Sequence, residues 1–126
     1  MVGIVLVSHS EKLVSGVLDF CRLMAKECPI ATAGGTSDGG YGTDYDKIKE
    51  AVSSVMSPEG VLIIMDLGSS VMTAEMVLDE FDSDTVMMAD CPMVEGAVAA
   101  TVEAEGGSNL LTVKQAAEEV REVSKF

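Results

Sequence analysis

VGIVLVSHSE, residues 2–11, is the stretch that decides the fold of this chain. Residues 2–7 are apolar without interruption, which is typical of a strand that is buried on both faces of a parallel sheet. The polar residues Ser8, His9 and Ser10 follow, and apolar residues then recur at helical spacing. In an open α/β sheet, ligands bind where the strands end and the helices begin. His9, the only histidine of the chain, is therefore predicted to lie at the functional edge of the sheet.

The alternation of strand and helix patterns continues along the chain. Further strands are predicted at residues 30–33, 61–65 and 85–89, each followed by apolar residues at helical spacing. This alternation predicts an α/β fold in one domain, residues 1–126, with a mainly parallel four-stranded sheet covered by helices on both faces. A Ser or Thr placed three residues before an acidic residue or Gln is typical of a helix start. The expected pairs are Ser8 with Glu11, Thr43 with Asp46, and Thr112 with Gln115.

The composition limits which partners and which cellular location are expected. Acidic residues outnumber basic ones by 21 to 8, which gives a formal net charge of −13. Nucleic acid and anionic membrane surfaces are disfavoured, because binding to them depends on Lys and Arg. No apolar run approaches the roughly 18 residues that span a bilayer, and the N-terminus lacks the basic segment of a signal peptide. Three cysteines without CxxC spacing indicate reduced thiols, so we expect a cytoplasmic protein.

The loops that follow the strands bring candidate functional residues to one edge. Asp66 ends the strand at 61–65, which we expect to be a neighbour of the strand before His9. Its carboxylate can accept the Nδ1–H of His9 and leave Nε2 as the nucleophile. Ser69 and Ser70 open the next helix, whose N-terminus can hold phosphate oxygens. The glycine-rich loop, residues 34–42, permits close backbone approach to the same edge.

Other chemistries fit the sequence less well. The glycine-rich loop matches neither the P-loop pattern nor the dinucleotide-binding pattern, and no bound cofactor is expected. One histidine and scattered aspartates do not make a metal-ligand cluster, so no metal site is expected. Cys91 lies before a helix start, where a thiolate is favoured, but a Cys–His dyad with His9 lacks the signature of that class. The residues alone allow two interpretations of His9, as a carrier of a phosphoryl group and as a purely structural residue.

Four segments of the chain, taken in order, resemble a known family. They are residues 3–10, 34–43, 63–70 and 92–96. Together they are similar to the mannose-family EIIA domains of the bacterial phosphotransferase system, and most similar to the DhaM phosphotransfer subunits of dihydroxyacetone kinases. The resemblance covers residues 1–124. It implies strand order 2-1-3-4 in the sheet and assembly as a homodimer.

The resemblance also implies roles for individual residues. In the family, the histidine that matches His9 accepts a phosphoryl group from the phosphocarrier protein HPr. It passes this group to ADP held on the DhaL subunit, and the resulting ATP phosphorylates dihydroxyacetone on DhaK. The carboxylate that matches Asp66 orients the imidazole. The residues expected to contact the phosphoryl oxygens are Gly68, Ser69, Ser70, Gly39 and Thr43.

Two alternatives to this function stay open. A mannose-family EIIA domain of a sugar transporter would pass its phosphoryl group to a histidine of a IIB domain, and a IIB-like segment after residue 126 would favour it. Those domains carry a fifth, antiparallel strand exchanged between subunits, and no fifth strand is predicted here. The other alternative is a non-catalytic α/β regulatory module in which His9 is a structural cap.

Overall fold

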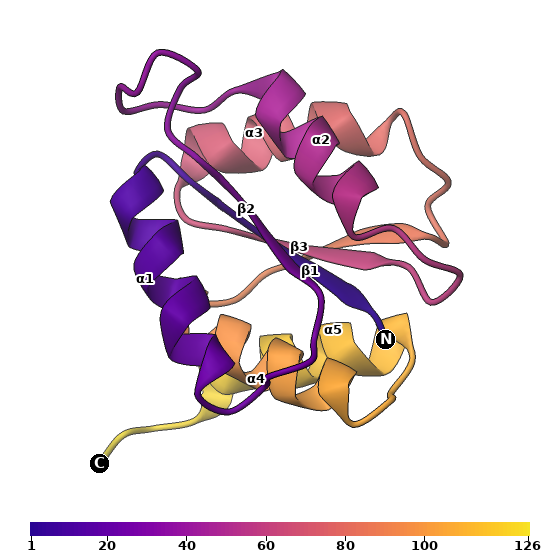
Figure 1. The fold of residues 1–126 in the computed structure, drawn as a ribbon. Helices are drawn as coiled ribbons and strands as arrows, with labels where there is room; N and C mark the ends of the chain where they lie inside the picture. The colour runs from indigo at the N-terminus through magenta and orange to yellow at the C-terminus, as the bar shows by residue number, and fades with distance from the viewer.

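A parallel sheet forms the middle layer of the protein (Figure 1). The computed structural model describes residues 1–126. Its four strands lie in the order β2-β1-β3-β4. Their bounds are Gly3–Ser8 for β1, Ile30–Gly34 for β2, Val61–Met65 for β3 and Val86–Ala89 for β4. The predicted α/β class, the four parallel strands and the order 2-1-3-4 are therefore confirmed.

Helices cover both faces of the sheet, as the alternation predicts (Figure 1). The helix bounds are Glu11–Arg22 for α1, Tyr45–Ser54 for α2, Gly68–Leu78 for α3, Met93–Glu105 for α4 and Leu110–Glu119 for α5. A short 3-10 turn, Val120–Glu122, follows α5. Helices α1, α4 and α5 pack on one face, and α2 and α3 pack on the other. None of these helices has the length and apolar character needed to cross a lipid bilayer.

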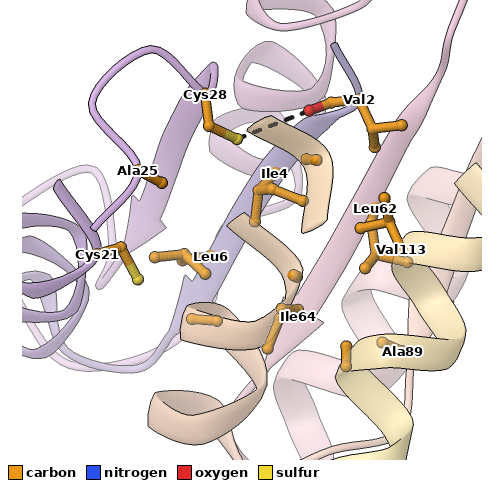
Figure 2. Packing of buried hydrophobic residues seen from close by; sticks show 14 of the residues in the cluster. Val2, Ile4, Leu6, Cys21, Ala25, Cys28, Leu62, Ile64, Ala89 and Val113 are labelled. Carbon is orange, nitrogen blue, oxygen red and sulfur yellow. Dashed lines mark hydrogen bonds between the residues drawn. The ribbon is translucent and has the colours of Figure 1, made fainter. Parts of the chain in front are cut away.

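The two central strands supply the core on both faces. Every residue of β1 and β3 is buried, because each strand has a neighbour on either side and helices above and below. Successive side chains of a strand point to opposite faces. The residues that face α1, α4 and α5 are Ile4, Leu6, Leu62 and Ile64 (Figure 2). Those that face α2 and α3 are Val5, Val7, Val61, Ile63 and Met65.

The helix starts differ from the predicted capping boxes. The residues that cap α1, α2 and α5 are Ser10, Asp44 and Asn109, whose side chains accept from Leu13 N, Lys47 N and Thr112 N at 3.2, 3.1 and 2.9 Å. The predicted caps Ser8, Thr43 and Thr112 are therefore wrong. Each predicted cap has another short polar residue close by along the chain, and such residues satisfy a helix N-terminus equally well. Ser8 instead remains in β1, and α1 begins after His9 and Ser10.

The three cysteines are free thiols, and two of them belong to the core. Cys28 lies with its sulfur 3.8 Å from the Val2 carbonyl oxygen (Figure 2). Burial raises the pKa of Cys28 to about 11. Burial also raises the pKa of Cys91 to about 11, and the carboxylates of Glu118 and Asp90 add to this effect. The prediction that a thiolate is favoured at Cys91 is wrong, because desolvation and acidic neighbours outweigh the helix terminus.

We predict that Gly34→Ala and Gly16→Ala change stability in opposite directions. A Cβ on Gly34 would lie 2.5 Å from Val14 Cγ2 and 2.6 Å from Glu11 Cα, so β2 and α1 would have to separate. This overpacking should lower the free energy of unfolding by about 1–3 kcal/mol. Gly16 is exposed on α1, and a Cβ added there would point into open space. Alanine there should raise stability by about 0.5–1 kcal/mol, because glycine weakens a helix interior.

Denaturant unfolding of the two variants and the wild type measures both changes. The Gly16→Ala protein serves as the control for the substitution itself. A Gly34→Ala protein as stable as the wild type would contradict the close approach of β2 and α1.

Candidate functional site

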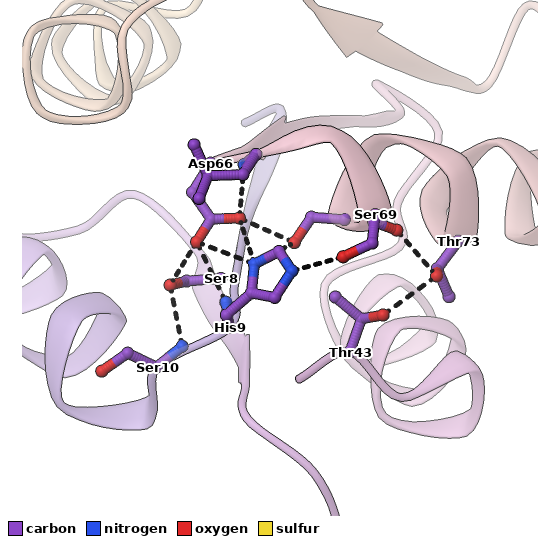
Figure 3. Close-up of polar contacts among 9 residues, drawn as sticks. Ser8, His9, Ser10, Thr43, Asp66, Ser69 and Thr73 are labelled. Carbon is purple, nitrogen blue, oxygen red and sulfur yellow. Dashed lines mark hydrogen bonds and ion pairs between the residues drawn. The ribbon is translucent and has the colours of Figure 1, made fainter. Parts of the chain in front are cut away.

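Strand pairing brings His9 and Asp66 together. His9 directly follows β1 and Asp66 directly follows β3, and these strands pair with Val7 opposite Met65. The Asp66 N–H donates to the Val7 carbonyl oxygen at 3.1 Å, which extends the ladder to the edge of the sheet. The two side chains meet there (Figure 3). The sequence prediction that they share one edge is confirmed by this pairing.

The carboxylate of Asp66 faces one ring nitrogen of His9. His9 Nδ1 lies 3.1 Å from Oδ1 and 3.2 Å from Oδ2 of Asp66. The backbone N–H of His9 also donates to Oδ2, at 3.0 Å. An ionised carboxylate can only accept, so Nδ1 carries the proton and Nε2 keeps its lone pair. The imidazole is thus held in one tautomer and one orientation.

The carboxylate of Asp66 is itself held by a dense set of donors. The Ser70 hydroxyl donates to Oδ1 at 2.7 Å, the Ser8 hydroxyl to Oδ2 at 2.8 Å, and the Leu67 N–H to Oδ1 at 2.6 Å. Partial burial alone would raise the pKa of Asp66. The hydrogen bonds from Ser70, His9, Ser8 and Leu67 outweigh burial and hold its pKa well below the usual range. The site therefore contains a carboxylate that stays ionised at neutral pH.

The other ring nitrogen of His9 faces the start of α3. The Ser69 hydroxyl is hydrogen-bonded to Nε2 (Figure 3). Because Nε2 has no proton in the tautomer set by Asp66, the hydroxyl is the donor of this bond. Ser69 and Gly68 are the first residues of α3, where backbone N–H groups have no intrahelical acceptor. Nε2 therefore contacts the N-terminus of a helix, a place that suits an anionic group.

Ser70 lies deeper than Ser69. It is fully buried, and its oxygen is 3.3 Å from His9 Nδ1 as well as bonded to Asp66. It thus faces the carboxylate side of the imidazole, whereas Ser69 faces the Nε2 side. The structure brings both predicted serines to the histidine but separates their positions.

Gly39 and Thr43 have other hydrogen-bond partners in this structure. The Gly39 N–H donates to the Thr36 carbonyl oxygen at 3.1 Å, within the glycine-rich loop. The Thr43 hydroxyl lies 3.1 Å from the Thr73 hydroxyl. No hydrogen bond joins either predicted residue to His9. The loop does reach His9 through Gly42, whose N–H donates to the His9 carbonyl oxygen at 3.1 Å. Phosphate contacts by Gly39 and Thr43 stay a prediction.

Two residues of the site are not predicted from the sequence. From the sequence, Ser8 is expected to be a helix cap. Its position at the end of an apolar strand is the signal for its true role, because a hydroxyl buried there needs a hydrogen-bond partner. Thr73 is not singled out at all. Its position one helical turn after Ser69 is the only signal, and its contact with Thr43 joins segments that are distant in the sequence.

We predict that Asp66→Asn destabilises the protein most at neutral pH. An amide cannot accept all the donors that converge on the carboxylate, so the loss should be about 1–3 kcal/mol at pH 7. The pKa of Asp66 is lower in the folded protein than in the unfolded chain. Its ionised form therefore stabilises the fold above the unfolded pKa of about 4, and this contribution is lost as the pH falls below that value.

Urea unfolding of the wild type and Asp66→Asn between pH 7 and pH 3 measures this difference, which should shrink below about pH 4. Asp90→Asn is the matched control, because Asp90 follows β4 at the same edge but is 83% exposed. That control should change stability by less than about 1 kcal/mol. A difference between wild type and Asp66→Asn that stays constant with pH would contradict an ionised, stabilising Asp66.

Comparisons with known proteins place the chain in a family. The family model EIIA-man, described as the PTS system fructose IIA component, matches residues 3–114. The phosphoryl donor subunit DhaM of a PEP-dependent dihydroxyacetone kinase from Providencia stuartii is 38% identical over 117 residues, which is 87% of this chain and 24% of that protein. The phosphotransferase subunit DhaM of a PTS-dependent dihydroxyacetone kinase from Lactococcus lactis is 30% identical over 118 residues, 94% of each protein.

The chain thus spans about a quarter of the first relative and nearly all of the second. The solved structure of a protein of unknown function is also similar, with a TM-score of 0.82 and 31% sequence identity. The match covers 94% of this chain and 95% of the chain in that structure. The chain therefore belongs to the EIIA-man family of the phosphotransferase system, in its DhaM branch.

Proposed function

We propose that the protein is a phosphoryl carrier in which Nε2 of His9 accepts a phosphoryl group from phospho-HPr and passes it to ADP bound on a DhaL subunit. The observation that carries the proposal is the orientation of one imidazole between two different groups. Nδ1 lies 3.1 Å from the Asp66 carboxylate, and Nε2 faces Ser69 at the start of α3. This arrangement prepares one nitrogen as a nucleophile and supplies donors for the group that it receives.

In the uptake step, the lone pair on Nε2 attacks phosphorus and the bond between phosphorus and HPr breaks. The imidazole of His9 becomes cationic as the new N–P bond forms, because Nδ1 keeps its proton. The ionised Asp66, in contact with Nδ1, stabilises that positive charge. Little further covalent chemistry is needed, since phosphoryl transfer depends chiefly on positioning and on charge stabilisation.

The start of α3 offers contacts for the phosphoryl oxygens. In the unphosphorylated protein the Ser69 hydroxyl is hydrogen-bonded to Nε2 of His9. It must therefore turn away from the ring when phosphorus binds to Nε2. It can then donate to a phosphoryl oxygen, together with the backbone N–H groups of Gly68 and Ser69. Gly68 is the first residue of α3, so its N–H has no intrahelical acceptor and is available to an anion.

In the delivery step, a terminal oxygen of ADP attacks phosphorus and the N–P bond to His9 breaks. The products are ATP and the neutral imidazole, ready for the next uptake. The names of the relatives, phosphoryl donor subunits of PEP-dependent dihydroxyacetone kinases, support this direction of transfer. We place DhaK and dihydroxyacetone downstream of the ATP, and a homodimer is the proposed assembly. Leu13 on the first turn of α1 and Leu67 directly before α3 are 42% and 67% exposed and offer apolar contacts to successive partners.

The proposal predicts that His9→Ala abolishes phosphoryl uptake from phosphoenolpyruvate, enzyme I and HPr, because no other histidine is present. Asp66→Asn should slow uptake by about 10- to 100-fold, the loss found when carboxylates that orient metal-bound histidines are removed. Intact-protein mass spectrometry over time measures both rates, and Asp90→Asn should load at the wild-type rate. Phosphate that remains on His9→Ala would contradict the assignment.

Adding purified DhaL with ADP to the phosphorylated protein tests the acceptor. ATP should form in step with the loss of phosphoryl group from His9. Transfer to a IIB domain of a mannose-family transporter, with no ATP formed on DhaL, would instead favour the sugar-transport alternative. A wild-type protein that never becomes phosphorylated would leave the non-catalytic module as the explanation.

A further inference from the structure

The glycine-rich loop, residues 34–42, is hydrogen-bonded to His9, and Thr43 directly after it lies beside Thr73 of α3 (Figure 3). Its last residue, Gly42, donates its N–H to the His9 carbonyl oxygen at 3.1 Å. The next residue, Thr43, lies with its hydroxyl 3.1 Å from that of Thr73 on α3. Among the hydrogen bonds of residues 34–44, this is the one that reaches α3. The end of the loop is therefore tied to α3 by a single pair of hydroxyl groups.

The direction of this hydrogen bond follows from the proton count. The Thr73 hydroxyl donates to the Ser69 carbonyl oxygen at 2.9 Å. A hydroxyl has one proton to donate, so the Thr43 hydroxyl must be the donor toward Thr73. The chain of donors thus runs from Thr43 to Thr73 to Ser69. Thr73 connects the loop end to the residue that contacts Nε2 of His9.

We infer that Thr73 is a positioning residue that holds the end of the glycine-rich loop closed beside Nε2 of His9. This inference rests on the proposed function, because its consequence is protection of a phosphoryl group on Nε2. Hydrolysis of such a group requires a water oxygen to attack phosphorus while the N–P bond breaks, giving inorganic phosphate and free imidazole. A closed loop limits the approach of that water, and a loop released from α3 does not.

Because the loop is rich in glycine, its closure depends on the hydrogen bond between Thr43 and Thr73. Gly35, Gly39 and Gly42 all have positive φ, at 68°, 88° and 142°. Glycine leaves the unfolded and opened states of such a segment many conformations, so closure has an entropic cost. The start of the loop is fixed by Lys47, whose ammonium group donates to the Gly34 and Thr36 carbonyl oxygens at 3.0 and 3.3 Å. The far end depends on Gly42 and on the pair Thr43 and Thr73.

The first test measures loop opening in the unphosphorylated protein. Thr73→Val keeps the shape of the side chain but removes the hydroxyl, and it should speed amide hydrogen exchange at Gly42 by about 2- to 10-fold, the range for one lost hydrogen bond. Thr73→Ser should restore the wild-type exchange rate. Thr85→Val is the matched control, because the Thr85 hydroxyl donates to Asp82 O at 2.8 Å, away from the site. Unchanged exchange at Gly42 in Thr73→Val would overturn the inference.

The second test measures the lifetime of the phosphohistidine after HPr and enzyme I are removed. Thr73→Val and Thr43→Val should each shorten it by about 2- to 10-fold, and the double variant should be no worse than Thr73→Val, because Thr43→Val removes only a hydrogen bond that Thr73→Val has already removed. Additive effects, or an unchanged lifetime with faster exchange at Gly42, would overturn the positioning role. If the wild type takes up no phosphoryl group, the proposed function fails, and the exchange rates still decide whether Thr73 closes the loop.

Discussion

The geometry of the site depends on the carboxylate of Asp66. Its donors come from two separate segments, Ser8 and His9 at the end of β1 and Leu67 and Ser70 around the start of α3. The carboxylate therefore joins the two segments and fixes the imidazole in the same contact. Parallel pairing of β1 with β3 is the precondition, because it sets the two strand ends side by side. One polar group thus makes the edge of the sheet both a structural junction and a candidate functional site.

The charge balance of this junction suits a phosphoryl group that is held only briefly. Hydroxyl and N–H groups, rather than a Lys or Arg, hold Asp66 ionised. The negative charge is thus free to stabilise a cationic imidazole through Nδ1. The start of α3 offers dipoles and a hydroxyl to the phosphoryl oxygens, and dipoles bind an anion more weakly than a full positive charge does. Such weak binding fits the brief residence of the phosphoryl group that the proposed relay between two partners requires.

The sequence is informative about this edge because buried parallel strands are apolar on both faces. The runs at residues 2–7 and 61–65 are therefore unmistakable, and His9 and Asp66 follow them directly. Helix starts are harder to predict, because several short polar residues near each one can cap equally well, as Ser10 rather than Ser8 does for α1. The role of Thr73 depends on how α2 and α3 are placed over the sheet, and local sequence does not carry that information.

The two walls of the site differ in how they are held, and this difference has a physical reason. The wall at α3 is fixed through Ser70, which is buried and bonded to an ionised carboxylate, and such charge-assisted bonds are strong. At the end of the glycine-rich loop the bonds join neutral groups, those of Gly42 and Thr43, and the charged Lys47 fixes only the start of the loop. The proposed phosphoryl carrier must keep the group that binds phosphate in place while it admits two different partners in turn. Strong bonds behind the imidazole and weaker ones beside Nε2 meet both requirements in one small site.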